Sequence, residues 1–385
     1  MGGKSRRDYL IAIRQRYVEA TREEKGVILR EFCTICDYHR KHAIRLLSQR
    51  KREPRKRPGR KPVYHSTELL RALKRIWLTT DQMCSKRLVV AIPLWLPFYE
   101  GLSDEVRTKL LSISAATIDR LLAPIRARTR PKGLGGTRPG SLLRNQIPIR
   151  THNWDITQPG FMEADTVAHC GNSMAGNFIW SLTLTDIHTG WTECRATWNN
   201  GANGVLKQIK NIEKDLPFQL QGFDCDNGSE FLNYHLVRYF TDHKPRVKFT
   251  RSRPYKKNDN AHVEQKNWSH VRHLLGYDRL DNPELVDLIN NLYDNEWSLL
   301  QNHFRPTLKL LEKKRINSKY KRKYETPKTP YQRLMESTHL PEEQKEQLNT
   351  CHRNLNPFKL KRTIERKLKA IFKLVRVTPN VRQRI

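Results

Sequence analysis

Three acidic residues in the middle of the chain have the types and the spacing for chemistry on phosphates. Asp165 lies in FMEADTVAHC, Asp226 in FDCDNGSEFLN, and Glu264 in RPYKKNDNAHVEQKNWSHVR. Carboxylates that are far apart in sequence, on different kinds of element, are what a protein needs to hold Mg²⁺ or Mn²⁺ by oxygen ligands near a phosphate. Together the three positions predict metal-dependent phosphodiester chemistry.

The first acid lies in an expected strand. One side of that strand carries the alternate residues Phe161, Glu163, Asp165 and Val167, because successive side chains of a strand point to opposite faces. A carboxylate that turns inward without a partner is costly, so Asp165 should meet a cation or become neutral. The alternative is a solvated face on which Glu163 and Asp165 are both exposed.

The second and third acids have alternatives of their own. Asp226 comes two residues after Asp224 at the end of a later strand, and the Asn-Gly pair that follows supplies a sharp turn that leaves the acid at the carboxyl end of that strand. The alternative is an ordinary Asp-Asn-Gly turn. Glu264 lies early in a helix, on a face that continues with the apolar residues Trp268, Val271 and Leu275. This face should point Glu264 toward the edge of the core. A glutamate in a first turn is also favoured by the helix dipole alone.

The charge of the chain indicates a polyanionic partner. The formal net charge is +33 over 385 residues, and it is segmented. Residues 1–150 hold 34 Lys and Arg against 13 Asp and Glu, residues 151–300 hold 15 against 19, and residues 301–385 hold 23 against 7. Cationic side chains gain affinity by releasing the counterions of nucleic-acid phosphates. We therefore expect DNA or RNA to be held by both flanks, in preference to a solvated basic or ribosome-associated protein.

Residues 1–50 have the pattern of a helix-turn-helix DNA-binding domain. Helical periodicity breaks near Asp37, and the following helix places Ala43, Leu46 and Leu47 inward. Its outward cations are the expected DNA contacts, Arg40, Lys41 and Arg45. A zinc site at Cys33, Cys36, His39 and His42 is the rejected alternative, because the loops between the pairs are too short and the cysteines fall at packing positions.

Two linkers flank a second helical region. Residues 51–64 form a basic, proline-rich linker that either follows the DNA backbone, through Arg57, Arg60 and Lys61, or is a solvated tether. Residues 65–126 predict a second helix-turn-helix region, with Ser114 as an N-cap and Arg120 as a DNA contact. Residues 127–150, rich in Gly, Arg and Pro, lead into the next domain.

Residues 151–315 predict an α/β catalytic core. Three β-branched and aromatic strands are followed by alternating helices and strands, which gives the βββαβαβα order of an RNase H-like core. Residues 316–385 are expected to be a basic, mostly helical region that binds DNA or a partner. Its last helix aligns the apolar residues Leu360, Ile364, Leu368 and Ile371 among lysines and arginines. The fold class is thus multidomain, with an all-α N-terminal part.

The segment from about 151 to 310 resembles the catalytic domain of retroviral-type integrases and of the DDE insertion-sequence transposases. The resemblance rests on DTVAH, DNGSEF and TRSRPYKKNDNAHVEQKN, with thirty-odd residues between the last two acids, and it continues in NWSHVRHLLGY and NHFRPTLKL. It implies that Asp165, Asp226 and Glu264 are the catalytic, metal-binding triad. Glu163 and Asp224 are then neighbours rather than ligands.

The resemblance also bears on DNA contacts. On the helix of Glu264, Trp268 and Val271 stand near places where retroviral integrases often have DNA-contacting lysines. We therefore expect this contact to shift to the nearby cations Lys256, Lys257, Lys266 and Arg272. The zinc-binding His/Cys domain of retroviral integrases has no counterpart in the sequence, where the helix-turn-helix region takes its place.

The implied activity is transposition. Two Mg²⁺ or Mn²⁺ ions about 4 Å apart, bridged by one aspartate, would activate first a water and then a DNA 3′-hydroxyl. The first step frees the 3′ end of a mobile element and the second joins it to target DNA without a covalent enzyme intermediate. The expected partners are double-stranded DNA, as terminal inverted repeats and target, and further copies of the chain in a synaptic complex.

Two other functions are compatible with such a core. A transposase-derived DNA-binding regulator is disfavoured because clustered acids are costly to keep without a metal. An RNase H-like nuclease is disfavoured because a hybrid nuclease needs no sequence-reading modules. We expect a cytoplasmic bacterial protein that associates with the nucleoid when it acts, because the start MGGKSRRDYL lacks an apolar stretch and no apolar run is long enough to span a bilayer. Seven scattered cysteines fit a reducing compartment.

Overall fold

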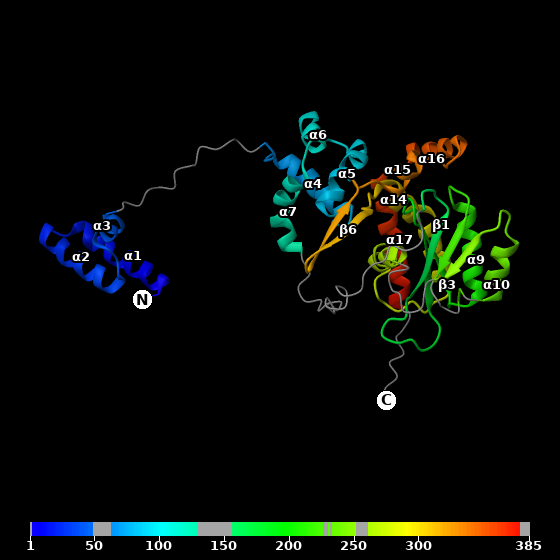
Figure 1. Cartoon of the computed structure of the whole chain (residues 1–385), viewed down its shortest axis with the longest axis horizontal. Helices are drawn as coiled ribbons and strands as arrows, with labels where there is room; N and C mark the ends of the chain where they lie inside the picture. The colour runs from blue at the N-terminus through cyan, green and yellow to red at the C-terminus, as the bar shows by residue number, and fades with distance from the viewer. Residues whose placement is uncertain are drawn as a thin grey trace. The chain divides into compact units, whose positions relative to one another are not determined.

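The structure is a computed structural model that describes residues 2–48, 63–129, 156–225, 230–231, 233–251 and 261–377. The chain divides into two compact units, Met1–Val63 and Tyr64–Ile385, and each has its own hydrophobic core (Figure 1). Among the described helices, none is long and apolar enough to cross a membrane.

The first unit consists of three helices, α1 (Gly3–Glu19), α2 (Arg22–Cys36) and α3 (Arg40–Ser48). Thr21 caps α2 and exchanges hydrogen bonds with Glu24, which satisfies amides that a helix start leaves open. Asp37 adopts a left-handed conformation with φ 54° and ends α2. The predicted break near Asp37 is therefore confirmed.

Helix α3 presents its cations to solvent. Ala43 and Leu47 are fully buried against the other two helices, together with Phe32 and Cys36. Leu46 is half-buried, and the predicted DNA contacts are exposed: Arg40, Lys41 and Arg45. Cys36 is thus a packing residue of this small core, and His42 packs edge-on against Tyr38 with ring centroids 4.9 Å apart.

A five-stranded mixed sheet organises the second unit, in the order β3-β2-β1-β4-β5. β1, β2 and β3 pair antiparallel, whereas β4 and β5 run parallel to β1. The strands are β1 (Phe161–Ala168), β2 (Ile179–Asp186), β3 (Thr192–Trp198), β4 (Gly222–Cys225) and β5 (Lys248–Arg251). With the helices between them, this is the predicted βββαβαβα order of an RNase H-like core.

Helices cover both faces of the sheet (Figure 1). One face packs on α9 (Ala202–Asp215) and α10 (Tyr234–Asp242), with Met162, Ala164 and Phe223 from the strands. The opposite face carries Val167 and Ile179 and belongs to the core that contains α12 (His273–Leu275), α13 (Leu285–Leu292) and α14 (Ser298–Phe304). The helix of Glu264, α11 (Ala261–Lys266), also packs against β1 and β2.

The second helical region packs on this core and lies in the same compact unit. It consists of α4 (Thr67–Thr79), α5 (Ser85–Trp95), the short 3-10 helix η1 (Leu96–Phe98), α6 (Asp104–Leu111) and α7 (Ala115–Thr129). Trp95 Nε1 donates to the Phe304 carbonyl at 3.0 Å, and Asp81 pairs with Arg305 at 2.5 Å and with Lys361 at 2.6 Å. Ser114 accepts from the Thr117 amide at 3.2 Å, so it caps α7 as predicted.

The C-terminal region differs from the expectation of a mostly helical segment. It begins with an antiparallel hairpin, β6 (Leu310–Ile316) and β7 (Lys319–Tyr324), and the boundary expected after residue 315 falls inside β6. Three helices follow, α15 (Pro330–Glu336), α16 (Glu342–Asn354) and α17 (Pro357–Val377). The apolar stripe predicted on α17 is confirmed, since Ile364 and Ile371 are buried and Leu360 and Leu368 pack beside them.

Candidate active site

Asp165 lies near the end of β1, on the face that meets helix α11. Its side chain is half-buried, and Asn267 Nδ2 donates to Asp165 Oδ2 at 2.6 Å while the Thr166 amide donates to Oδ1 at 2.8 Å. Two residues earlier, Glu163 is only 2% exposed and accepts from the Val263 amide at 3.1 Å. The predicted alternation of β1 is therefore right, but the deeply buried acid is Glu163 and the more open one is Asp165.

Glu264 is held beside β1 by its neighbours in the helix. Val263 bonds to Glu163 and Asn267 bonds to Asp165, so β1 is tied to the helix before and after Glu264. Residues three apart lie on the same side of a helix. Asn267 reaches Asp165 from that side, and the Glu264 side chain is exposed there. The helix that carries Glu264 is thus bonded to β1 at Glu163 and at Asp165.

Asp226 lies outside the described residues, but both flanks of its segment are tied to β1. Strand β4 ends at Cys225, which pairs with Ala164. On the other flank, Glu230 is 8% exposed and accepts from Thr166 Oγ1 at 3.0 Å. Cys225 and Glu230 thus meet the residues of β1 that precede and follow Asp165. Asp224 accepts from Thr250 Oγ1 at 2.6 Å on β5.

Asn267, which contacts Asp165, and Glu230, which contacts Thr166, were not revealed by the sequence patterns. Each stood inside a motif that carried an acid, three residues after Glu264 and four after Asp226. Neither residue type by itself indicates a role, because asparagine and glutamate side chains are ordinarily exposed. For Asn267 the signal was spacing alone, because it lies about one helical turn from Glu264.

The donor atoms of the site suit a hard divalent cation. The side chains that meet there offer carboxylate and amide oxygens, and Asn267 Oδ1 is buried with no hydrogen-bond partner within the described part of the chain. An amide oxygen without a partner beside a carboxylate matches the preference of Mg²⁺ and Mn²⁺ for oxygen. No group of three or more His, Cys, Asp or Glu that could hold a metal occurs among the described residues, which exclude Asp226.

The face predicted for Glu264 needs a correction. Val271 and Leu275 are fully buried, but Trp268, four residues after Glu264, is 60% exposed. The helix changes to a π-helix, η2, over Asn267–Arg272, and a π turn holds more residues than an α turn. The wider turn divides the predicted face in two. Glu264 and Trp268 face solvent, whereas Val271 and Leu275 face the core.

Lys266 was predicted to contact DNA, and its burial shows that this prediction is wrong. It is 8% exposed, and its Nζ donates to the Gly190 carbonyl at 3.0 Å. Burial, with the nearby cations Arg87 and Arg333, lowers the pKa of the Lys266 ammonium to about 7. A phosphate cannot reach this group without displacing the core that surrounds it.

The other predicted DNA contacts have different surroundings. Arg272 is half-buried, donates to the Ala168 carbonyl at 2.8 Å and stacks over Tyr277. Arg120 is exposed on α7. The remaining ones lie outside the described residues: Arg57, Arg60, Lys61, Lys256 and Lys257.

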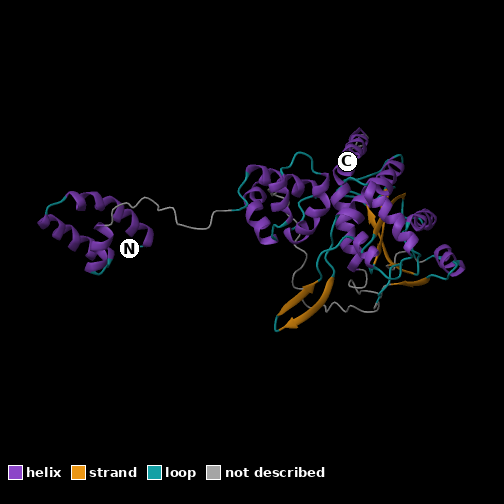
Figure 2. Cartoon of the chain, turned by 90° about the horizontal axis from the view of Figure 1, so that it is seen from above, coloured by secondary structure: helices purple, strands orange, loops and turns teal. Residues whose placement is uncertain are grey.

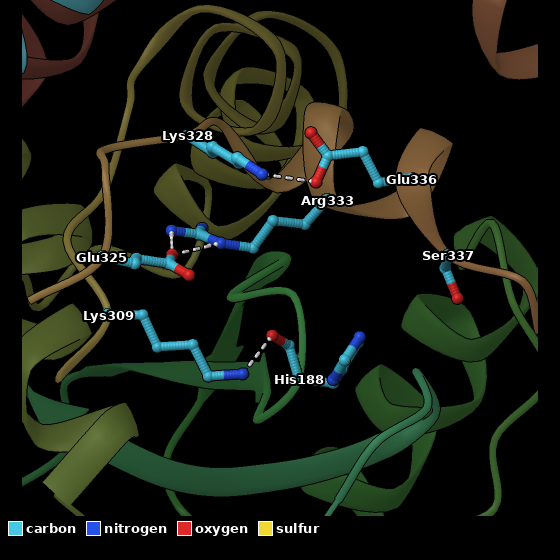
Figure 3. A pocket seen from close by; sticks show the side chains of 7 residues that line it. All are labelled: His188, Lys309, Glu325, Lys328, Arg333, Glu336 and Ser337. Atoms are coloured by element: carbon cyan, nitrogen blue, oxygen red, sulfur yellow. Dashed lines mark hydrogen bonds and ion pairs between the residues drawn. The ribbon is translucent and has the colours of Figure 1, made fainter. Parts of the chain in front are cut away.

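A small polar pocket of about 210 Å³ lies apart from the acids, at the root of the β6–β7 hairpin (Figure 3). Lys328 pairs with Glu336 at 2.6 Å, Arg333 pairs with Glu325, and Lys309 Nζ donates to the His188 carbonyl at 2.9 Å. Because these charged side chains already have partners within the protein, we interpret the pocket as a structural contact between the hairpin and the core, not as a ligand site.

Comparisons with known proteins give one relative and several fold neighbours. No protein-family model matches the chain. The chain is 41% identical over 341 residues to the uncharacterized protein y4rM of Sinorhizobium fredii (strain NBRC 101917 / NGR234), covering 86% of this chain and 95% of that protein.

Solved structures that are similar include retroviral integrase cores. The HTLV-2 integrase catalytic core domain in complex with magnesium is 15% identical, with a TM-score of 0.28, and the match covers 39% of this chain and 90% of that one. The BIV integrase catalytic core domain is 14% identical, with a TM-score of 0.31 and coverages of 47% and 96%. Likeness at this level does not bear on activity. The 41% identity over nearly the whole length does bear on descent, and the chain belongs to the family of the rhizobial protein y4rM.

Proposed function

We propose that the chain is a DDE-type transposase, which cleaves DNA at the ends of a mobile element and joins the freed 3′ ends to target DNA. The observation that supports this function is that two distant parts of the chain meet β1 at Asp165 and its immediate neighbours. Cys225 pairs with Ala164, Glu230 accepts from Thr166, and Asn267 donates to Asp165 itself. Segments more than sixty residues apart in sequence are thus tied to three consecutive residues of β1.

The same convergence supports Asp226 as the second acid. Asp226 is bonded directly to Cys225, and consecutive Cα atoms are about 3.8 Å apart. Because Cys225 lies opposite Ala164, we propose Asp226 as the second acid of the triad and Glu264 as the third.

Asp165, Asp226 and Glu264 would hold Mg²⁺ or Mn²⁺. When bound, the cation would polarise the phosphate and lower the pKa of an attacking water or 3′-hydroxyl. Asn267 fixes the orientation of the Asp165 carboxylate, and the buried Glu163 anchors the start of the helix through the Val263 amide. No side chain has to serve as the nucleophile, because water and DNA supply the attacking oxygens.

The function is tested by the DNA that surrounds the coding region. A transposase gene should be flanked by short inverted repeats bounded by a direct duplication. The purified chain, given a duplex that ends in those repeats and Mg²⁺, should nick the 3′ ends and produce joined products on a target plasmid. Flanks without repeats, together with no nicking on any tested end, would overturn the proposal.

Loss of the Asn267 amide should weaken catalysis without removing it. We expect Asn267→Leu to lower the cleavage rate by about 10–100-fold and to raise the Mg²⁺ concentration needed for half-maximal rate, because residues that orient a metal ligand have effects of this size. The measurement is a metal titration of cleavage. Gln265→Leu, the same type of change at an exposed neighbour, is the control. An unchanged metal requirement in Asn267→Leu would show that the Asn267–Asp165 bond is not part of the site.

The first unit should read the element's ends. Because α4–α7 are built into the core, the fragment that can be tested alone is residues 1–63, which has its own buried core. We expect it to bind the terminal repeats specifically. Replacing all three exposed cations of α3 (Arg40, Lys41 and Arg45) with Ala should cost about 1–3 kcal/mol for each side chain that reads a base.

A charge-matched control is available in the same unit. Alanine at Arg16, Arg22 and Arg30, which are exposed on α1 and α2, removes the same charge and should weaken binding while keeping the preference for the repeats. The measurement is competition between repeat DNA and unrelated DNA. A fragment that shows no preference would place recognition elsewhere in the chain.

A further inference from the structure

The β6–β7 hairpin stands out from the body of the second unit (Figure 2). Its strands pair from Leu310↔Tyr324 to Ile316↔Lys319, and a two-residue turn, with Asn317 at φ 53°, closes the end. A positive φ at the first position of a two-residue turn is typical of hairpins whose strands keep the normal twist. The result is a narrow two-stranded ribbon.

The hairpin has no core of its own. Leu311, Ile316 and Tyr324 are 58%, 53% and 47% exposed, and no residue of the two strands belongs to a buried cluster of the described chain. A two-stranded hairpin is at best marginally stable by itself in water. Something at its root must therefore hold it in place.

The root is held by Arg333. Arg333 is 8% exposed, and its guanidinium donates to the Thr307 carbonyl and to the Thr189 carbonyl, both at 3.0 Å, and also to Glu325. Lys309 Nζ donates to the His188 carbonyl at 2.9 Å, as Figure 3 shows. The start and the end of the hairpin are thus fixed to the turn that precedes β3.

The charge of the ribbon works against its own stability. Residues 310–324 hold seven Lys and Arg against one acid, Glu312. Lys314 and Lys321 stand directly opposite each other, and like charges in that position destabilise a strand pair. The hydrogen bond with Glu312 at 2.6 Å raises the pKa of Lys314, so this lysine remains charged. A bound polyanion would remove the repulsion.

We infer that the β6–β7 hairpin is an arm that binds double-stranded DNA, with the ribbon in the major groove. The major groove is about 12 Å wide and admits a two-stranded β-ribbon. Strands of this length span roughly 20 Å, at about 3.3 Å per residue, which is enough to follow the groove past several base pairs. The inference rests on the proposed function only for the identity of the polyanion, since the charge and the anchoring are properties of the hairpin itself.

The test removes charge from one strand. Lys319, Lys321 and Lys323 are exposed at alternate positions of β7, and the arm variant replaces all three with Gln. The matched control replaces Lys207, Lys210 and Lys214, which are exposed on α9, with Gln. Both are made in the full chain carrying Glu264→Gln, so binding is measured without cutting and stays readable even if the wild-type chain proves not to cleave DNA.

The measurement is the affinity for a labelled 30-base-pair duplex as a function of salt. The slope of log K against log salt falls by about 0.9 for each phosphate that the protein no longer neutralises. The arm variant should therefore lose roughly 2–3 from the slope and bind at least about tenfold more weakly, whereas the control should keep the slope. Some of the guanine N7 atoms, which lie in the major groove, should be protected from methylation by the parent and not by the arm variant.

Three outcomes would overturn the inference. They are an unchanged slope in the arm variant, equally tight binding of a single strand of the same sequence, and a loss of self-association in sedimentation with DNA binding intact, which would make the arm an interface between copies of the chain. Thermal unfolding of the arm variant should occur at no lower temperature than that of the parent, because the change removes the repulsion between Lys314 and Lys321.

Discussion

Asp165→Asn, Asp226→Asn and Glu264→Gln should each abolish 3′-end cleavage and strand joining while leaving binding to the element's ends nearly intact. Each change keeps the size of the side chain and removes one carboxylate charge. A metal-held phosphate gains several kcal/mol of transition-state stabilisation, and each 1.36 kcal/mol is about tenfold in rate. The expected loss is therefore about a thousandfold or more, measured as nicked and joined products on end-labelled DNA.

Two aspartates provide controls for this result. Asp224→Asn keeps an oxygen that can accept from Thr250 Oγ1, so it should retain activity despite lying two residues from Asp226. Asp278→Asn changes an exposed carboxylate in the loop after the helix and should have no effect. If any one of the three triad variants keeps more than a few per cent of wild-type cleavage, its residue does not belong to the site.

Activity should depend on Mg²⁺ or Mn²⁺, be lost in EDTA and be absent with Ca²⁺ although DNA still binds. The oxygen donors around Asp165 favour hard cations, whereas Ca²⁺ is larger and accepts looser coordination that does not enforce in-line attack. The measurement is cleavage and binding of the same labelled end after dialysis against EDTA and addition of each ion. Robust cutting in EDTA would contradict the metal-dependent mechanism.

The sequence predicted best those features that local patterns determine. The alternation around Asp165 placed β1, the break at Asp37 separated α2 from α3, and Ser114 was recognisable as a cap. Each depends on residues within one or two turns of the position, where propensity and hydrogen-bonding chemistry act directly.

Features that depend on distant contacts could not be predicted in this way. The docking of α4–α7 depends on bonds such as Trp95 to Phe304, which are far apart in sequence. The run KYKRKY has no apolar alternation to mark β7 as a strand, because neither face of the hairpin is buried. The exposure of Trp268 follows from a π turn. A π turn adds less than one residue to each helical turn, and a motif of a few residues does not show so small a change of period.

The loop before β3 has a mechanical role that follows from two bonds already described. Lys266 of α11 donates to the Gly190 carbonyl, and Arg333, which anchors the hairpin, donates to the Thr189 carbonyl, so both are bonded to adjacent peptide groups. Gly190 adopts φ 76°, a conformation that other residues rarely take. A force on DNA bound to the hairpin would therefore reach α11, the helix that bears Glu264, through the bonds to Thr189 and Gly190. DNA binding by the hairpin, as proposed, would then be mechanically coupled to the position of Glu264 through the peptide groups of Thr189 and Gly190.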